Sequence, residues 1–160
     1  MKVGLLLLLA VTAQLVGFAG ERRPGPKPAT TNVIPAVELR GQVVCLSEEM
    51  RRLHGASVPD KHQHDYGFKT DTGFFYSLAR TSLSEALLTD TNLLGKTFLL
   101  KGRIFPKSQI FEVTGNVHTV MGGKVFELFY YCDICSIKSS VPGPCMCCRE
   151  PVHLVEGQTK

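Results

Sequence analysis

Five of the six cysteines lie near the C-terminus, in the stretch YYCDICSIKSSVPGPCMCCREPVHLV at residues 130–155. Four of them form two CxxC pairs, Cys132 with Cys135 and Cys145 with Cys148. A CxxC turn can present both sulfur atoms to one ion, and four thiolates complete a tetrahedral zinc site. The spacer between the pairs contains VPGP, whose prolines and glycine favour a chain reversal. The spacing therefore predicts a four-cysteine zinc-knuckle hairpin over residues 132–160.

The same thiols permit other chemistry. An exported chain meets an oxidising compartment, where these cysteines could form disulfides instead. A CxxC pair also suits thiol redox chemistry, although no thioredoxin-like βαβ pattern surrounds either pair here. Two cysteines remain outside the proposed ligand set: Cys147 lies inside the second pair, and Cys45 lies in an early strand. Each is expected to be a packed apolar residue, a disulfide partner of the other or, for Cys147, a thiol that exchanges with the ligands.

The C-terminal segment resembles the short heavy-metal-binding segments attached to bacterial envelope metal-transport proteins. The matching residues are Tyr131-Cys132 and PGPCMCC at 142–148. That family often has a histidine where this chain has Cys135. The resemblance covers about 25 residues and implies metal binding; it also implies an envelope metal-handling role as an alternative function.

The histidines offer weaker candidates. His62 and His64 alternate along the polar loop between Asp60 and Asp65, so on an extended chain both would point to one side. With those carboxylates they could form a weak metal site; a solvated loop is the simpler interpretation. His153 follows the second CxxC pair and is a candidate outer or substitute ligand. The remaining histidines, His54 and His118, are isolated.

The N-terminus predicts export. Residues 1–20, MKVGLLLLLAVTAQLVGFAG, combine one early cation, an apolar run and small closing residues, as in a secretory signal peptide. An uncleaved membrane anchor is the alternative. Residues 21–36 are rich in proline and cations and read as a flexible linker. We therefore expect a secreted or periplasmic protein with no stable membrane span after cleavage.

Between the linker and the cysteines, alternating apolar residues and turn signals predict a mainly β domain over residues 37–131. Glycines within the first strand, at Gly41, and within the strand after the helix, at Gly102, suit the sharp bends of a small barrel. The order of elements is that of an OB-like Greek-key β-barrel with one short helix; a β-sandwich is the rival. The expected elements are strands at 37–46, 97–105, 108–120 and 124–131, a hairpin at 66–79, a helical turn at 47–55 and a helix at 82–95.

Through VELRGQVV, the hairpin and LLGKTFLLKGRIF, this region resembles secreted bacterial OB-fold-like proteins. The resemblance implies binding of oligonucleotides, sugars or proteins on one barrel face. The aromatic strands together with Lys101 and Arg103 would suit stacking of single strands or an oligosaccharide. The net charge of +4 is too small to indicate a nucleic-acid partner.

No catalytic triad order, phosphate-binding glycine loop or helical HExxH pattern occurs in the sequence. We therefore expect a non-enzymatic binding module of unknown protein or small-molecule ligand, stabilised by a structural zinc ion.

Overall fold

The computed structural model describes residues 33–158. The predicted signal peptide, and the linker as far as residue 32, lie outside the described residues. Within the described part, no helix is long and apolar enough to cross a membrane.

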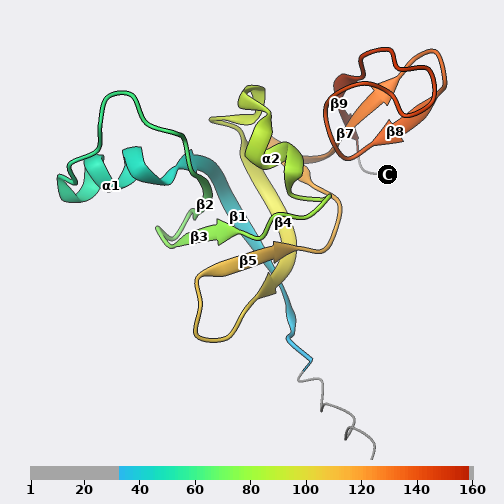
Figure 1. Ribbon diagram of the computed structural model, residues 1–160. Coiled ribbons are helices and arrows are strands. Elements are labelled where there is room, and N and C mark those ends of the chain that lie inside the picture. Colours follow the sequence, from blue (N-terminus) through green and yellow to red (C-terminus); the bar gives the residue numbers. More distant parts are fainter. Residues whose placement is uncertain (1–32, 159–160) are drawn as a thin grey trace, which may run out of the picture. The chain divides into compact units, whose positions relative to one another are not determined.

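Five strands close into a barrel, as the sequence predicts (Figure 1). The first strand pairs with both the second and the fourth, and the third lies parallel to the fifth, which returns to the fourth. Parallel pairing of the third and fifth strands across an intervening helix is the OB-like Greek-key arrangement. These strands are β1 (Ala36–Cys45), β2 (Tyr66–Thr70), β3 (Phe75–Leu78), β4 (Thr97–Ile104) and β5 (Ile110–Val113).

The helical segments differ in detail from the prediction. The expected helix at 82–95 is divided into α2 (Glu85–Thr89) and a single 3-10 turn, η1 (Thr91–Leu93). Ser84, rather than Ser82, precedes α2, and its buried hydroxyl donates to the carbonyl of Ala79 instead of capping the helix. The predicted turn after β1 is a nine-residue helix, α1 (Leu46–His54), which buries none of its residues.

The core fills the barrel with side chains from alternate positions of its strands. Phe68, Phe98 and Phe111 have no exposed surface, and Leu87 and Leu93 reach the same core from α2 and η1. Burial of aromatic side chains of this size contributes much of the stability of a small domain. Most of the aromatic residues that were predicted as candidates for ligand stacking are therefore buried in the core or half-buried.

Two glycines allow neighbouring strands of the barrel to approach closely. A Cβ atom on Gly41 would overlap the backbone carbonyl of Lys69, and one on Gly102 would overlap that of Glu112. A Cβ atom on Gly102 would also lie 2.5 Å from the ring of Phe111. The glycines that predicted sharp bends are thus required by backbone contact.

Four further strands extend the sheet beyond the barrel. The predicted strand at 108–120 is interrupted after β5, because Thr114 and Gly115 both turn back to the carbonyl of Lys101. A turn with positive φ at Gly122 and Gly123 then joins β6 to β7, as expected for a tight hairpin. Strands β8 and β9 both pair with β7 (Figure 1). The bounds are β6 (His118–Met121), β7 (Lys124–Cys132), β8 (Ile137–Ser139) and β9 (His153–Gln158).

Polar contacts join this extension to the barrel. The Tyr130 hydroxyl donates to a carboxylate oxygen of Asp90 at 2.6 Å, and Lys96 pairs with Glu156 at 3.0 Å. Burial and the Asp90 carboxylate both raise the pKa of Tyr130, so the phenol remains protonated. β7 consequently belongs to the core as well as to the C-terminal hairpin.

Gly102→Ala should destabilise the barrel by about 3 kcal/mol, because the new methyl group would collide with backbone that cannot move aside. Gly115→Ala is the matched control, since its Cβ would meet only the flexible side chain of Lys101 at 3.3 Å. Urea unfolding of both variants measures the difference. Equal midpoints would contradict the close approach.

Glu49 should make stability sensitive to acid. Hydrogen bonds from Arg52 and Lys69 lower the pKa of Glu49 from its ordinary value of 4.5 to about 2. The stabilisation is therefore complete above pH 4.5 and is lost as the pH falls towards 2. Because both cations are partly exposed, we expect about 1 kcal/mol. Glu49→Gln should lose it at pH 7 and show a flatter acid profile than Glu85→Gln, which breaks an exposed pair with Arg80.

Candidate metal centre

Strand alternation on β7 places the first cysteine. Leu128, Tyr130 and Cys132 occupy every second position and are all buried, with exposed fractions of 6%, 2% and 1%. Side chains two apart on a strand share a face. The face that packs against the barrel core therefore ends in the sulfur of Cys132.

The two CxxC pairs form matching turns. The sulfur of Cys132 accepts hydrogen bonds from the backbone N–H groups of Cys135 and Ile134. Likewise, the sulfur of Cys145 accepts from the N–H groups of Cys148 and Cys147. In each turn, N–H groups at the second and third following residues point at the first sulfur, an arrangement that stabilises a thiolate.

The residue after each pair also has the same backbone conformation. Ser136 has φ of 54° and Arg149 has φ of 66°, both in the left-handed region that non-glycine residues rarely occupy. Backbone hydrogen bonds between Cys145 and Glu150 and from Arg149 to Cys145 close the second turn. The two CxxC turns thus end in the same uncommon backbone conformation.

The four predicted ligands converge. Cys132, Cys135, Cys145 and Cys148, hereafter the four-cysteine cluster, have sulfur atoms that all lie within 4.8 Å of one another. The sulfurs of Cys132 and Cys148 are 3.4 Å apart, without a disulfide bond. Sulfurs around a tetrahedral ion with bonds of about 2.3 Å are about 3.8 Å apart. The cluster therefore fits one metal ion.

Electrostatics distinguish the thiols. The backbone N–H groups of Cys148 and Cys147 lower the pKa of Cys145 to about 7. At Cys132 the N–H group of Cys135 acts in the same direction, but burial and the neighbouring thiols outweigh it and raise the pKa. Hydrogen bonds with Cys147 and Cys148 raise the pKa of Cys135. A metal ion binding here must displace protons, so its affinity rises with pH.

The other cysteines in the described chain take different places. All six cysteines lie within residues 33–158 and are unpaired. Cys147 is exposed and hydrogen-bonded to Cys135, but it is not in the four-cysteine cluster. Cys45 is buried, as expected for a residue on the first strand.

His54, His118 and His153 all lie apart from the candidate metal ligands, so the suggestion that His153 is a substitute ligand is not supported. His153 faces Asp133, at 3.3 Å, and the ring of Tyr131, and it does not join the four-cysteine cluster. His54 and His118 lie outside both groups of metal-binding side chains found in the described residues.

His62 and His64 do come together, but with different partners from those expected. The prediction offered Asp60 and Asp65, whereas Asp60 lies 3.7 Å from Arg51 and the histidines face Cys45 and Glu48. The signal available in the sequence was a Cys-x-x-Glu step, Cys45 to Glu48, followed by a His-x-His step, His62 to His64, on the next polar loop.

Comparison of the chain with protein-family models, with curated proteins and with solved structures gave no match.

Cys145→Ser should lower the metal affinity of the four-cysteine cluster by more than about 100-fold. Loss of even an outer contact to a metal ligand lowers affinity 10- to 100-fold. Cys147→Ser is the matched control, two positions away and outside the cluster. Elemental analysis should show one ion fewer per chain in the first variant alone. Limited proteolysis should cut its segment between β8 and β9 faster. Loss of the ion in both variants would contradict the ligand assignment.

Proposed function

We propose that the protein is an exported, non-enzymatic binding module: an OB-like barrel whose C-terminal hairpin is held by a structural zinc ion. The observation that carries the zinc proposal is the closed set of four sulfurs, with Cys132 and Cys145 only 1% and 4% exposed. Catalytic zinc sites keep a position open for water or substrate, while structural sites use four protein ligands. Tetrahedral thiolate sites suit zinc or iron, and zinc has no redox reaction that an oxidising compartment would disturb.

The C-terminal hairpin buries too little apolar surface to be ordered by packing alone. Between β8 and β9 the chain runs through residues 140–152, and its largest apolar side chain, Met146, is 82% exposed. Ile134 in the first turn is 70% exposed. A segment with so little buried apolar surface gains its order from metal ligation and a few backbone hydrogen bonds.

Support for a binding role comes from the connection between β1 and β2. OB-like barrels commonly bind ligands on the face of strands 2 and 3 and with the loop joining strands 1 and 2. Here that connection holds α1 and a polar loop, residues 46–65, beside an open cleft of about 460 Å³. The cleft is lined by residues of β1, β2, α1 and η1, including Val43 and Tyr66, and by Leu94 just after η1.

The alternative ligands predicted from the sequence receive unequal support. Arg103 of the suggested stacking face is engaged by Glu112 across the sheet, and Phe98 is fully buried. The exposed thiol of Cys147 beside Cys135 supports the alternative role in metal or thiol handling, since a fifth thiol can exchange with bound ligands.

Purified mature protein should contain one zinc ion per chain that resists dialysis against a chelator and leaves only on unfolding. Elemental analysis after dialysis, with a count of reactive thiols, measures this. The mass of the purified protein should match a chain that begins at Glu21 if residues 1–20 are removed on export. Metal-free protein with disulfides among the four cysteines would overturn the zinc proposal. Copper that exchanges readily at these cysteines would favour metal handling instead.

A further inference from the structure

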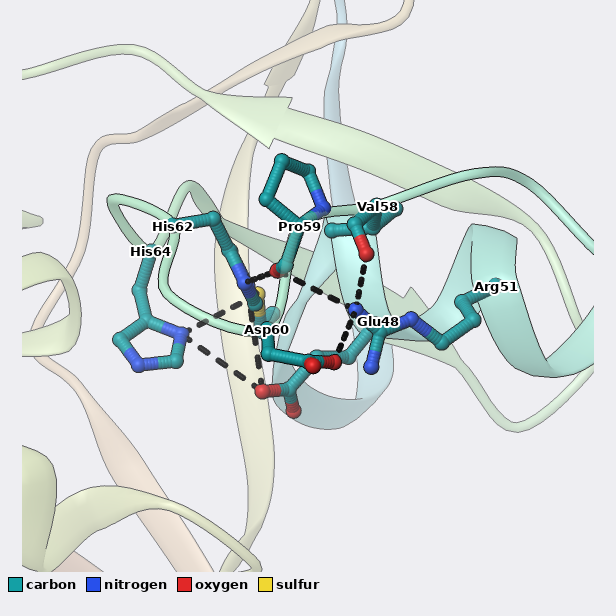
Figure 2. A network of polar contacts seen from close by, with 8 residues as sticks. Glu48, Arg51, Val58, Pro59, Asp60, His62 and His64 are labelled. Carbon is teal, nitrogen blue, oxygen red and sulfur yellow. Dashed lines mark hydrogen bonds and ion pairs between the residues drawn. The ribbon is translucent and has the colours of Figure 1, made fainter.

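A second group of side chains that could bind a metal ion lies in the first half of the chain, far in sequence from the four-cysteine cluster. Cys45, Glu48, His62 and His64, hereafter the His-Cys-Glu cluster, have ligand atoms that all lie within 4.8 Å of one another. Figure 2 shows His62 and His64 on the polar loop, both directed toward Glu48 on α1. Cys45 is the last residue of β1, so strand, helix and loop each contribute.

The individual distances fit one ion. The sulfur of Cys45 lies 3.5 Å from Nε2 of His62 and 3.4 Å from Nδ1 of His64. Oε1 of Glu48 lies 3.9 Å and 3.8 Å from the same two nitrogens. Donors around a tetrahedral ion, with bonds of about 2.0–2.3 Å, are about 3.3–3.6 Å apart. The distances between the sulfur and the two nitrogens match this spacing, and those to Glu48 exceed it by a few tenths of an ångström.

The protein also fixes the orientation of His62. Its Nδ1 lies 2.9 Å from the backbone carbonyl of Pro59. A carbonyl only accepts, so Nδ1 carries the proton and Nε2 directs its lone pair toward Cys45. Histidines that bind metals characteristically donate their other nitrogen to a carbonyl or carboxylate in this way. The guanidinium of Arg51 in turn contacts the carbonyls of Val58 and Pro59, which holds the loop in place (Figure 2).

One side of the cluster is protected and the other is open. Cys45 is buried and the side chain of His62 is 11% exposed, whereas those of Glu48 and His64 are 56% and 48% exposed. Cys45, Glu48 and His64 also line the open cleft between β1, β2 and α1. An ion here would meet solvent and anything bound in the cleft, unlike an ion in the four-cysteine cluster.

Polar contacts, such as those of Arg51 with the loop and of Glu49 with Lys69, hold this region in place rather than buried apolar side chains. None of the residues of α1 is buried, and the loop is joined to the start of α1 by a backbone hydrogen bond from Leu46 to Asp65. Hydrogen bonds can link these groups in pairs, with the thiol donating to Nε2 of His62 and Nδ1 of His64 donating to the sulfur. A shared cation satisfies all four groups.

We propose that the His-Cys-Glu cluster is a second, exchangeable metal site that takes a borderline-soft divalent transition-metal ion such as zinc. One thiolate, two imidazoles and one carboxylate are the donors that this class of ion prefers, while magnesium and calcium take oxygen ligands almost exclusively. This site is independent of the structural zinc proposed above.

Titration of the reduced, metal-free full chain with cobalt(II) tests the proposal, because thiolate-to-cobalt absorption reports how many sulfurs bind each ion. The wild-type chain should bind two cobalt ions, and Cys145→Ser should retain one ion with a single-thiolate spectrum. His64→Gln should lower the cobalt affinity of the His-Cys-Glu cluster at least 10-fold and leave binding of the four-thiolate ion unchanged. His54→Gln, a nearby exposed histidine on α1, should bind as the wild type does.

Two further readouts separate metal binding from simple packing. Zinc should displace cobalt from this site, whereas millimolar magnesium or calcium should not. Amide exchange in α1 and residues 55–65 should slow about 10-fold on zinc addition in Cys145→Ser and not in Cys145→Ser combined with His64→Gln. Binding of a single ion that is lost completely in Cys145→Ser would overturn the proposal, as would displacement by calcium or an unchanged titration in His64→Gln.

Discussion

The alternation of side chains along two strands is the constraint on which both candidate metal-binding groups depend. On β1, Gly41, Val43 and Cys45 are buried in turn, and on β7 the same pattern ends at Cys132. A shift of either strand by one residue would turn its cysteine to the opposite face. The pairing of β1 with β4 and of β7 with β9 fixes those registers. Barrel packing therefore sets the position of one ligand in each group.

The remaining ligands are supplied by segments that contribute little to the core. The turns holding Cys135 and Cys148 and the loop holding His62 and His64 consist mainly of exposed or half-buried residues. Each group thus combines a buried sulfur on a strand with ligands on turns, on a loop or on α1, which add little to the core. Such a division suits metal binding coupled to local folding, since an ion gains most by ordering what packing leaves free.

Much of this arrangement was predictable from the sequence. The barrel was predicted from the alternation of apolar residues, from the turn residues and from Gly41 and Gly102. Glycine is required wherever two strand backbones approach too closely for a Cβ atom. The four-cysteine cluster followed from spacing, since both members of a CxxC pair belong to one local turn. The capping pattern at Ser82 failed because α2 begins two residues later than it predicts, after a local turn in which the Ser84 hydroxyl donates to Ala79. The His-Cys-Glu cluster could not be assembled in advance, because its two pairs of ligands are joined through a helix and a loop whose path the spacing does not determine.

The pairing of β1 with β4 also has a consequence for the order in which the molecule assembles. It joins the first strand to one that follows β2, β3 and α2, so closing the barrel requires contacts between distant parts of the chain. Contacts of this kind form slowly, because the entropy lost in closing a long loop precedes the gain from packing. The four-cysteine cluster, by contrast, is drawn from one short stretch of sequence. The two CxxC turns can therefore form locally before the barrel closes, whereas Cys132 reaches its final position only when β7 packs against the core.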